Sequence, residues 1–231
     1  FDEKKVLEKA DKLYALRSDF EAIADAVCEK GFDNILFTSA GGSLAALEPY
    51  CYIMKTMSKI PAFTEIPAEL MATGNPLVTD KTLAILTSKS GDTKETVAVA
   101  KWLKERNVTT VSFCGEPDSP LKAVTDYSVC YGDADPHDLC ALFVITKIMY
   151  NKGEFDEYPK FIEALKNFGN VLVSVSKAAD DYGKEYAALF EKEDKEYQMW
   201  IGSGNTWGPT YSMAMCILEE MQWIKTKSIH A

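Results

Sequence analysis

Short apolar runs alternate with helical segments over residues 31–131, and this alternation constrains the fold more than any other feature of the sequence. The clearest run is 82–87, and similar runs bounded by turn residues occur at 34–38, 61–64, 108–113 and 126–131. Segments 44–57 and 93–106 have the apolar spacing of helices. The pattern predicts an α/β fold with a doubly wound parallel sheet, whose ligands bind beyond the carboxyl ends of the strands.

The segments outside this alternation are expected to be mainly helical. Residues 2–30 contain neither Gly nor Pro, and 139–190 has helical spacing with breaks near 152 and 182. A second strand–loop–helix unit begins with a strand at 197–201 and continues into a helix from Pro209, since Pro is favoured in a first helical turn. The expected organisation is an N-terminal helical segment (1–30), a first α/β domain (31–150), a helical connection (151–195) and the start of a second α/β domain (196–231).

Charge and composition limit the partners of the chain. The chain has 25 Lys and Arg residues and 35 Asp and Glu residues, which give it a net charge of −10. So acidic a surface repels nucleic acid and anionic lipid, and we expect neither as a partner. The six cysteines are scattered and lack the spacing of metal ligands, which is typical of a reduced, cytoplasmic chain without a metal site, although a catalytic thiol is an alternative use for any one of them. Because the chain begins at Phe1 and stops without a helix stop signal, we expect it to be a fragment of a longer protein.

The sequence Ser-Lys-Ser-Gly-Asp-Thr at 88–93, here called the SKSGDT loop, joins a predicted strand to a predicted helix. A helix N-terminus offers free N–H groups and a favourable dipole to a phosphate. Gly91 would let the backbone approach the anion, and Lys89 would either assist or face water. Hydroxyl donors come from Ser88, Ser90 and Thr93. Ordinary helix capping is the alternative, but it requires one hydroxyl rather than three.

A second loop, Ala-Gly-Gly-Ser at 40–43, follows the first predicted strand. Paired glycines are common in turns, so the loop is weak evidence by itself. Its predicted place beside the SKSGDT loop makes Gly42 and Ser43 candidates for contact with sugar hydroxyls.

Glu220 is the candidate acid–base residue. Met213, Ile217, Glu220 and Ile224 recur at helical spacing, which predicts an apolar stripe carrying a carboxylate, with Glu219 pointing elsewhere. Burial raises the pKa of a carboxyl group toward values useful for proton transfer, whereas a structural ion pair is the alternative. His137 and His230 are the two histidines, and such residues are more often structural than catalytic.

Together these motifs resemble the sugar isomerase (SIS) domain family. The SKSGDT loop is similar to the family signature S-x-S-G-x-T, and the 40–43 loop resembles the first Gly/Ser loop of the family. The segments EEMQW at 219–223 and SIHA at 228–231 are similar to the fructosamine-6-phosphate deglycases, relatives of the isomerase half of glucosamine-6-phosphate synthase. The resemblance implies tandem SIS domains, each a flavodoxin-like five-stranded parallel sheet flanked by helices, with the second one truncated here. It also implies a homodimer with active sites near the subunit boundary.

By position, the resemblance assigns site residues as well. Phosphate contacts fall to the SKSGDT loop, sugar contacts to Gly42 and Ser43, the catalytic carboxylate to Glu220, and a place beside the active site to His230. The family's other catalytic His and its Schiff-base Lys would lie beyond Ala231, and the junction at 131–136 is shorter than its counterpart in relatives.

The functional hypothesis is therefore a phosphosugar deglycase that needs no cofactor. It would split a 6-phosphorylated fructosamine or glucosamine-type conjugate into hexose 6-phosphate and a free amine by proton transfer between C1 and C2. One alternative is an aldose–ketose or aminotransferase-type phosphosugar isomerase. The other is a non-catalytic SIS module that senses a phosphosugar.

Overall fold

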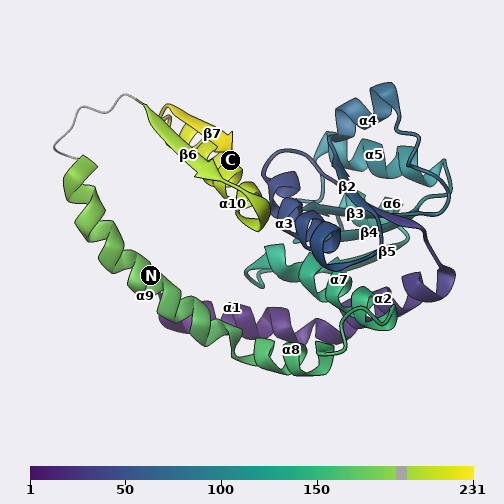
Figure 1. Ribbon diagram of the computed structural model, residues 1–231, viewed down its shortest axis with the longest axis horizontal. Coiled ribbons are helices and arrows are strands. Elements are labelled where there is room, and N and C mark those ends of the chain that lie inside the picture. The colour runs from purple at the N-terminus through teal and green to yellow at the C-terminus, as the bar shows by residue number, and fades with distance from the viewer. Residues whose placement is uncertain (191–196) are drawn as a thin grey trace.

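A five-stranded parallel sheet forms the centre of the computed structural model, which describes residues 1–190 and 197–231 (Figure 1). The order β2-β1-β3-β4-β5 is that of flavodoxin-like folds. Each strand lies within one or two residues of its predicted position: β1 Asn34–Thr38, β2 Ala62–Glu65, β3 Thr82–Ser88, β4 Thr109–Cys114 and β5 Tyr127–Cys130. The predicted α/β sheet is confirmed.

Strand β3 lies in the middle of the sheet and is buried along its whole length. It pairs with β1 on one side, where Leu83 is opposite Ile35, and with β4 on the other, where Leu83 is opposite Thr109. A strand covered on both faces has no solvent-facing side to carry polar residues. Its sequence is therefore a continuous apolar run, which is why it was the clearest strand in the sequence.

Helices cover both faces of the sheet (Figure 1). The larger core lies under α1 (Glu3–Ala15), α2 (Arg17–Lys30), α3 (Gly42–Met57) and α7 (Cys140–Asn151), and includes Phe20, Phe37 and Phe113. The smaller core lies under three shorter helices and includes Leu36 and Leu86. Those helices are α4 (Pro67–Thr73), α5 (Lys94–Lys104) and α6 (Pro120–Val124).

The predicted helix over 2–30 is in fact two helices, α1 and α2, separated at Leu16. The Leu16 N–H donates to Leu13 O at 3.1 Å, which tightens the last turn of α1 and lets α2 start in a new direction. The new direction brings Phe20 into the core, where it stacks on Phe143 with ring centroids 5.3 Å apart.

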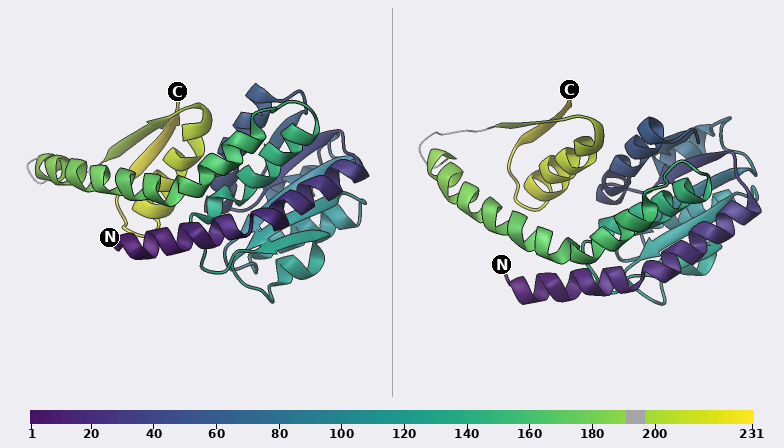
Figure 2. Two further views of the ribbon diagram at one scale, coloured as in Figure 1. Left: turned by 90° about the horizontal axis from the view of Figure 1, so that it is seen from below. Right: turned by 60° about the horizontal axis from the view of Figure 1, so that its bottom comes forward.

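The helical region after the sheet has one of its two predicted breaks. The chain leaves α7 near residue 152 and forms α8 (Tyr158–Ala164), the short η2 (Leu165–Asn167) and α9 (Phe168–Phe190). The break predicted near 182 is wrong, because α9 continues through Gly183; one glycine costs a helix only about 1 kcal/mol. Figure 2 shows α1 and α9 running side by side, and the close approach of Gly169 to Leu7 lies in this contact.

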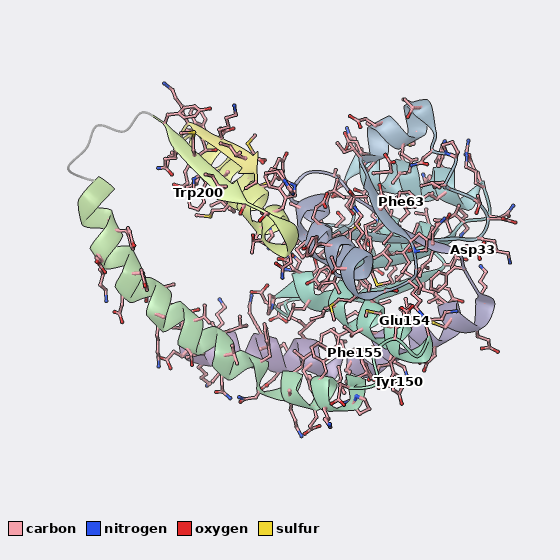
Figure 3. The ribbon with its side chains drawn as sticks, in the orientation of Figure 1. Asp33, Phe63, Tyr150, Glu154, Phe155 and Trp200 are labelled. Atoms are coloured by element: carbon pink, nitrogen blue, oxygen red, sulfur yellow. The ribbon has the colours of Figure 1, made fainter. Side chains whose placement is uncertain are left out.

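A turn between α7 and α8 joins this helical region to α3. The Glu154 carboxylate accepts hydrogen bonds from the Ser58 hydroxyl and from the Lys59 N–H, the latter at 3.0 Å. Tyr150, Glu154 and Phe155 lie around this turn (Figure 3). The turn therefore fixes the end of α3 that is remote from the 40–43 loop.

Residues 197–231 form a small strand–helix–strand unit beside α3 (Figure 1). Its parallel strands are β6 (Gln198–Gly202) and β7 (Thr226–His230), joined through η3 (Gly204–Thr206), α10 (Trp207–Tyr211) and the π-helix η4 (Ser212–Glu219). Strand β7 was not predicted. Residues 191–195, the end of the predicted connection, and residue 196 lie outside the described residues, and a second SIS domain here stays a prediction.

Contact between α10 and α3 holds this unit in place. A Cβ added at Gly208 would lie 2.1 Å from Ala45 O and 3.0 Å from Glu48 Cβ, so the two helix backbones touch. Among the helices of the described ranges, none combines the length and apolar character needed to cross a lipid bilayer.

Candidate functional site

The SKSGDT loop connects β3 to α5 and is closed on itself. Ser88 Oγ and Thr93 Oγ1 lie 2.9 Å apart, and Gly91 N–H donates to Ser88 Oγ at 3.1 Å. Because the Thr93 hydroxyl bonds to Ser88, it does not cap α5, and the first N–H groups of that helix remain available to an anion. Ser90 is exposed, so its hydroxyl is the most accessible of the three.

Gly91 has a packing role in addition to the predicted one. Its φ of +68° lies in the left-handed region, and an added Cβ would lie 2.3 Å from Ser119 Cβ. The loop is also bonded to the chain after β4, because Leu121 N–H donates to Gly91 O and Gly115 N–H donates to Lys89 O, both at 2.9 Å. Gly91 therefore lets the loop pack against Ser119. The Lys89 side chain is exposed.

Ser39 joins the second loop to the first. It is fully buried, and its Oγ accepts the Thr87 N–H at 2.9 Å and lies 2.9 Å from Thr87 O. Thr87 immediately precedes the SKSGDT loop, so the carboxyl ends of β1 and β3 are tied together. Gly42 and Ser43, at the start of α3, are half-buried beside this junction. The structure thus brings the two predicted ligand loops together, and the Ser39 link was missed from sequence.

The η4 helix meets the 40–43 loop at Gly42. A Cβ on Gly42 would lie 3.4 Å from Cys216 Sγ. Burial raises the pKa of the Cys216 thiol, and the charge of nearby Glu220 raises it further. Cys216 is therefore near both Gly42, in the predicted sugar loop, and Glu220, the predicted acid–base residue.

The predicted burial of Glu220 is wrong. Glu220 is exposed, and the three apolar residues of the predicted stripe are exposed by 38%, 39% and 37% at Met213, Ile217 and Ile224. Residues Ser212–Glu219 form a π-helix with i→i+5 bonding, so the α-helical spacing that the prediction assumed does not hold over them.

Glu219 is the more constrained of the two glutamates, contrary to the prediction. It is half-buried, and its carboxylate accepts hydrogen bonds from Thr226 N at 2.9 Å and from Thr226 Oγ1 at 3.1 Å. Glu219 therefore fixes the start of β7 against η4, which leaves Glu220 as the carboxylate facing outward.

The two histidines lie in different surroundings. His230 ends β7, is exposed, and packs edge-on against Trp207 with ring centroids 5.1 Å apart. His137 stacks on Tyr131 at 5.0 Å and lies 3.3 Å from Asp135 Oδ1. The contacts of His137 are those of a structural residue.

Two cavities flank α3, and the sequence predicted neither. The first, here called the Trp207 cavity, has a volume of about 410 Å³ and lies between the 40–43 loop, the turn from β2 to α4, and α10. The second, here called the η4 cavity, has a volume of about 340 Å³ and lies between α3, the helix α10–η4 and Asp138. Their walls come from segments far apart in the chain: the Trp207 cavity includes Ser39, Glu48, Glu65 and Trp207, and the η4 cavity includes Tyr50, Asp138, Ser212 and Ile217.

Comparison with known proteins identifies relatives of both sequence and fold. Residues 31–151, just over half of the chain, match the family model described as "SIS domain". The chain is 32% identical over 212 residues to fructosamine deglycase FrlB of Bacillus subtilis (strain 168), an alignment that covers 87% of this chain and 63% of FrlB. The chain thus spans less than two thirds of the length of that relative.

Solved structures share the fold. A candidate phosphosugar isomerase from Salmonella typhimurium LT2 superposes with a TM-score of 0.83 at 23% identity, covering 93% of this chain and 67% of its own. The C-terminal domain of glucosamine-fructose-6-phosphate aminotransferase from Francisella tularensis has a TM-score of 0.76 at 20% identity, covering 98% and 69%.

Proposed function

Because the chain belongs to the SIS domain family, as its loops predicted, we propose that it is part of an enzyme that cleaves a 6-phosphorylated fructosamine. The products would be a hexose 6-phosphate and a free amine. The observation that carries the proposal is the 32% identity to a fructosamine deglycase through 87% of the chain. The geometry of the two joined loops supports it, because they lie together at the carboxyl ends of β1 and β3, where the uncapped start of α5 is available to a phosphate.

In this proposal the SKSGDT loop holds the phosphate. Free N–H groups at the start of α5 and the exposed Ser90 hydroxyl point to the same end of the sheet, and each hydrogen bond to a charged oxygen is stronger than a neutral one. Gly42 and Ser43 then face the sugar hydroxyls. Binding energy at the phosphate would position the reacting carbons at the other end of the sugar.

Replacing Ser90 by Ala is expected to weaken binding of fructose 6-phosphate by about 1.5–3 kcal/mol, the scale of one hydrogen bond to a charged group. The variant should unfold at the same temperature as the wild type, because Ser90 is exposed and the loop is closed by Ser88 and Thr93. Titration calorimetry measures the affinity. Ser174→Ala, at an exposed position on α9, is the control; if both variants bind equally well, Ser90 does not contact the phosphate.

Glu220 is proposed to move the proton between C1 and C2 through an enol-type intermediate. It lies next to Cys216, which contacts Gly42, while Glu219 is engaged by Thr226. We further propose a homodimer whose partner subunit covers this exposed face and removes the reacting atoms from water. Among the described residues, His230, which packs edge-on against Trp207, is our candidate for assisting the opening of the sugar ring.

The decisive experiment incubates the full-length protein with a 6-phosphofructosyl amine and assays release of glucose 6-phosphate and amine. We expect release by the wild type and a kcat lower by about a hundredfold in Glu220→Gln, the lower end of the range for a lost acid–base group. Glu185→Gln, an exposed glutamate on α9, is the control.

Three other outcomes would contradict the proposal. Equal rates in wild type and Glu220→Gln would remove Glu220 from the mechanism. Isomerisation of fructose 6-phosphate without amine release would establish the isomerase alternative. Binding of phosphosugar with no turnover would establish the sensory module.

A further inference from the structure

The η4 cavity is not used by any step proposed above. It is bounded by Pro49 and Tyr50 on α3, by Asp138 in the turn η1 (His137–Leu139), and by the helix α10–η4. It lies along the same contact between α3 and η4 in which a Cβ added at Gly42 would be 3.4 Å from Cys216 Sγ. Ile217 in its wall directly follows Cys216, and Glu220 comes three residues later.

Tyr50 carries an unpaired hydroxyl in this cavity. Its side chain lines the cavity and is only 6% exposed, yet its hydroxyl forms no hydrogen bond to any described residue. Burial raises the pKa of Tyr50 well above its usual value, and the charge of Asp138 raises it further. The phenol therefore keeps its proton and can both donate and accept. A polar ligand group in the cavity could therefore donate to this hydroxyl or accept from it.

Apart from Ser212, the rest of the wall is apolar with a single negative charge. Met213 and Ile217 are 38% and 39% exposed, so a ligand could cover apolar surface there. Asp138 supplies the carboxylate, and His137 Nε2 lies 3.4 Å from its Oδ1. Among the described residues that line the cavity there is no Lys or Arg. A ligand group with a negative charge would face Asp138 without a compensating cation, whereas an ammonium group would be matched.

We propose that the η4 cavity holds the amine portion of the substrate and selects amines that end in a second, positively charged nitrogen. The aliphatic chain would lie against Met213 and Ile217, and its terminal ammonium would reach Asp138 and the Tyr50 hydroxyl. This inference rests on the proposed deglycase function. The proposal places the C6 phosphate in the SKSGDT loop and the amine at the opposite end of the sugar, on the η4 side of Gly42.

Binding of two matched ligands tests the inference. They are the 6-phosphofructosyl conjugates of 1,4-diaminobutane and of butylamine, each reduced at C2 so that neither can be enolised or cleaved. Titration calorimetry on the full-length protein is expected to show tighter binding of the diamine conjugate. In Asp138→Asn the diamine conjugate should bind about fivefold more weakly, as for a partly exposed ion pair, and the butylamine conjugate should be unaffected. Tyr50→Phe should give a loss of about fivefold, the scale of one hydrogen bond, on the same ligand only.

The Trp207 cavity supplies the control. It contains Glu48 and Glu65, and the double substitution Glu48→Gln with Glu65→Gln should leave the preference for the diamine conjugate intact. Equal binding of the two conjugates by the wild type would overturn the inference. So would a preference that survives Asp138→Asn, or one that the double substitution abolishes. The reduced ligands are not turned over, so this binding test does not depend on catalysis. If the deglycase proposal itself fails, the unreduced conjugate will release no amine.

Discussion

Gly91→Ala is expected to unfold the SKSGDT loop and to lower the free energy of unfolding by about 2–5 kcal/mol, the sum of a left-handed alanine and an overpacked contact. The new Cβ would lie 2.3 Å from Ser119 Cβ and 2.5 Å from Ser119 Oγ, distances that no rotamer change at position 91 relieves. Since the loop also bonds to Leu121 and Gly115, its displacement should abolish detectable binding of fructose 6-phosphate.

Gly74→Ala is the matched control for this prediction. Gly74 has the same φ of +68°, but nothing lies within 4 Å of an added Cβ, so its replacement costs only the backbone strain of about 1–2 kcal/mol. Urea unfolding gives the free energy of unfolding of both variants, and the difference between their losses is the cost of the contact with Ser119. If Gly91→Ala is no less stable than Gly74→Ala, the packing against Ser119 does not hold the loop.

Gly208→Ala is expected to separate the C-terminal unit from α3 and to cost about 3 kcal/mol of stability, the upper end of the range for overpacking. Its added Cβ would meet Ala45 O at 2.1 Å and Pro49 Cδ at 3.0 Å, and the first of these is backbone that cannot turn away. Urea unfolding measures the cost. A red shift in Trp207 fluorescence is also expected, because this half-buried indole lies next to the contact.

Gly183→Ala provides the comparison. Gly183 lies within α9 with open space around it, so alanine should stabilise the chain by about 0.5–1 kcal/mol. If Gly208→Ala behaves like Gly183→Ala, the tight contact between α10 and α3 is not required for the unit to dock.

The centre of the sheet could be predicted from sequence because β1 and β3 are buried on both faces, so each is a largely apolar run. Strand β7 could not, because only its first residue is buried, it pairs with β6 alone among the described strands, and it carries Lys227 and Ser228 among its five residues. The break at Leu16 was missed for another reason. Leu16 is a good helix former, and the change of direction serves the burial of Phe20 against distant residues.

The two ligand loops were predictable because each is a run of consecutive residues at the end of a strand. The half-burial of Glu219 and the exposure of Glu220 were not, since both residues lie at the end of a π-helix that apolar spacing alone does not reveal. The η4 cavity could not be predicted from sequence either. Tyr50, Asp138 and Ser212 become neighbours only when three separate elements pack together.

Ser39 has a thermodynamic consequence for any ligand that spans the two loops. Its buried hydroxyl fastens the ends of β1 and β3 to each other before a ligand arrives. Ordering a mobile loop on binding costs conformational entropy, about 0.5–1.5 kcal/mol for each side chain immobilised. With the loops already fixed, that entropy is lost during folding rather than during association, and more of the contact energy remains to distinguish one phosphorylated sugar from another.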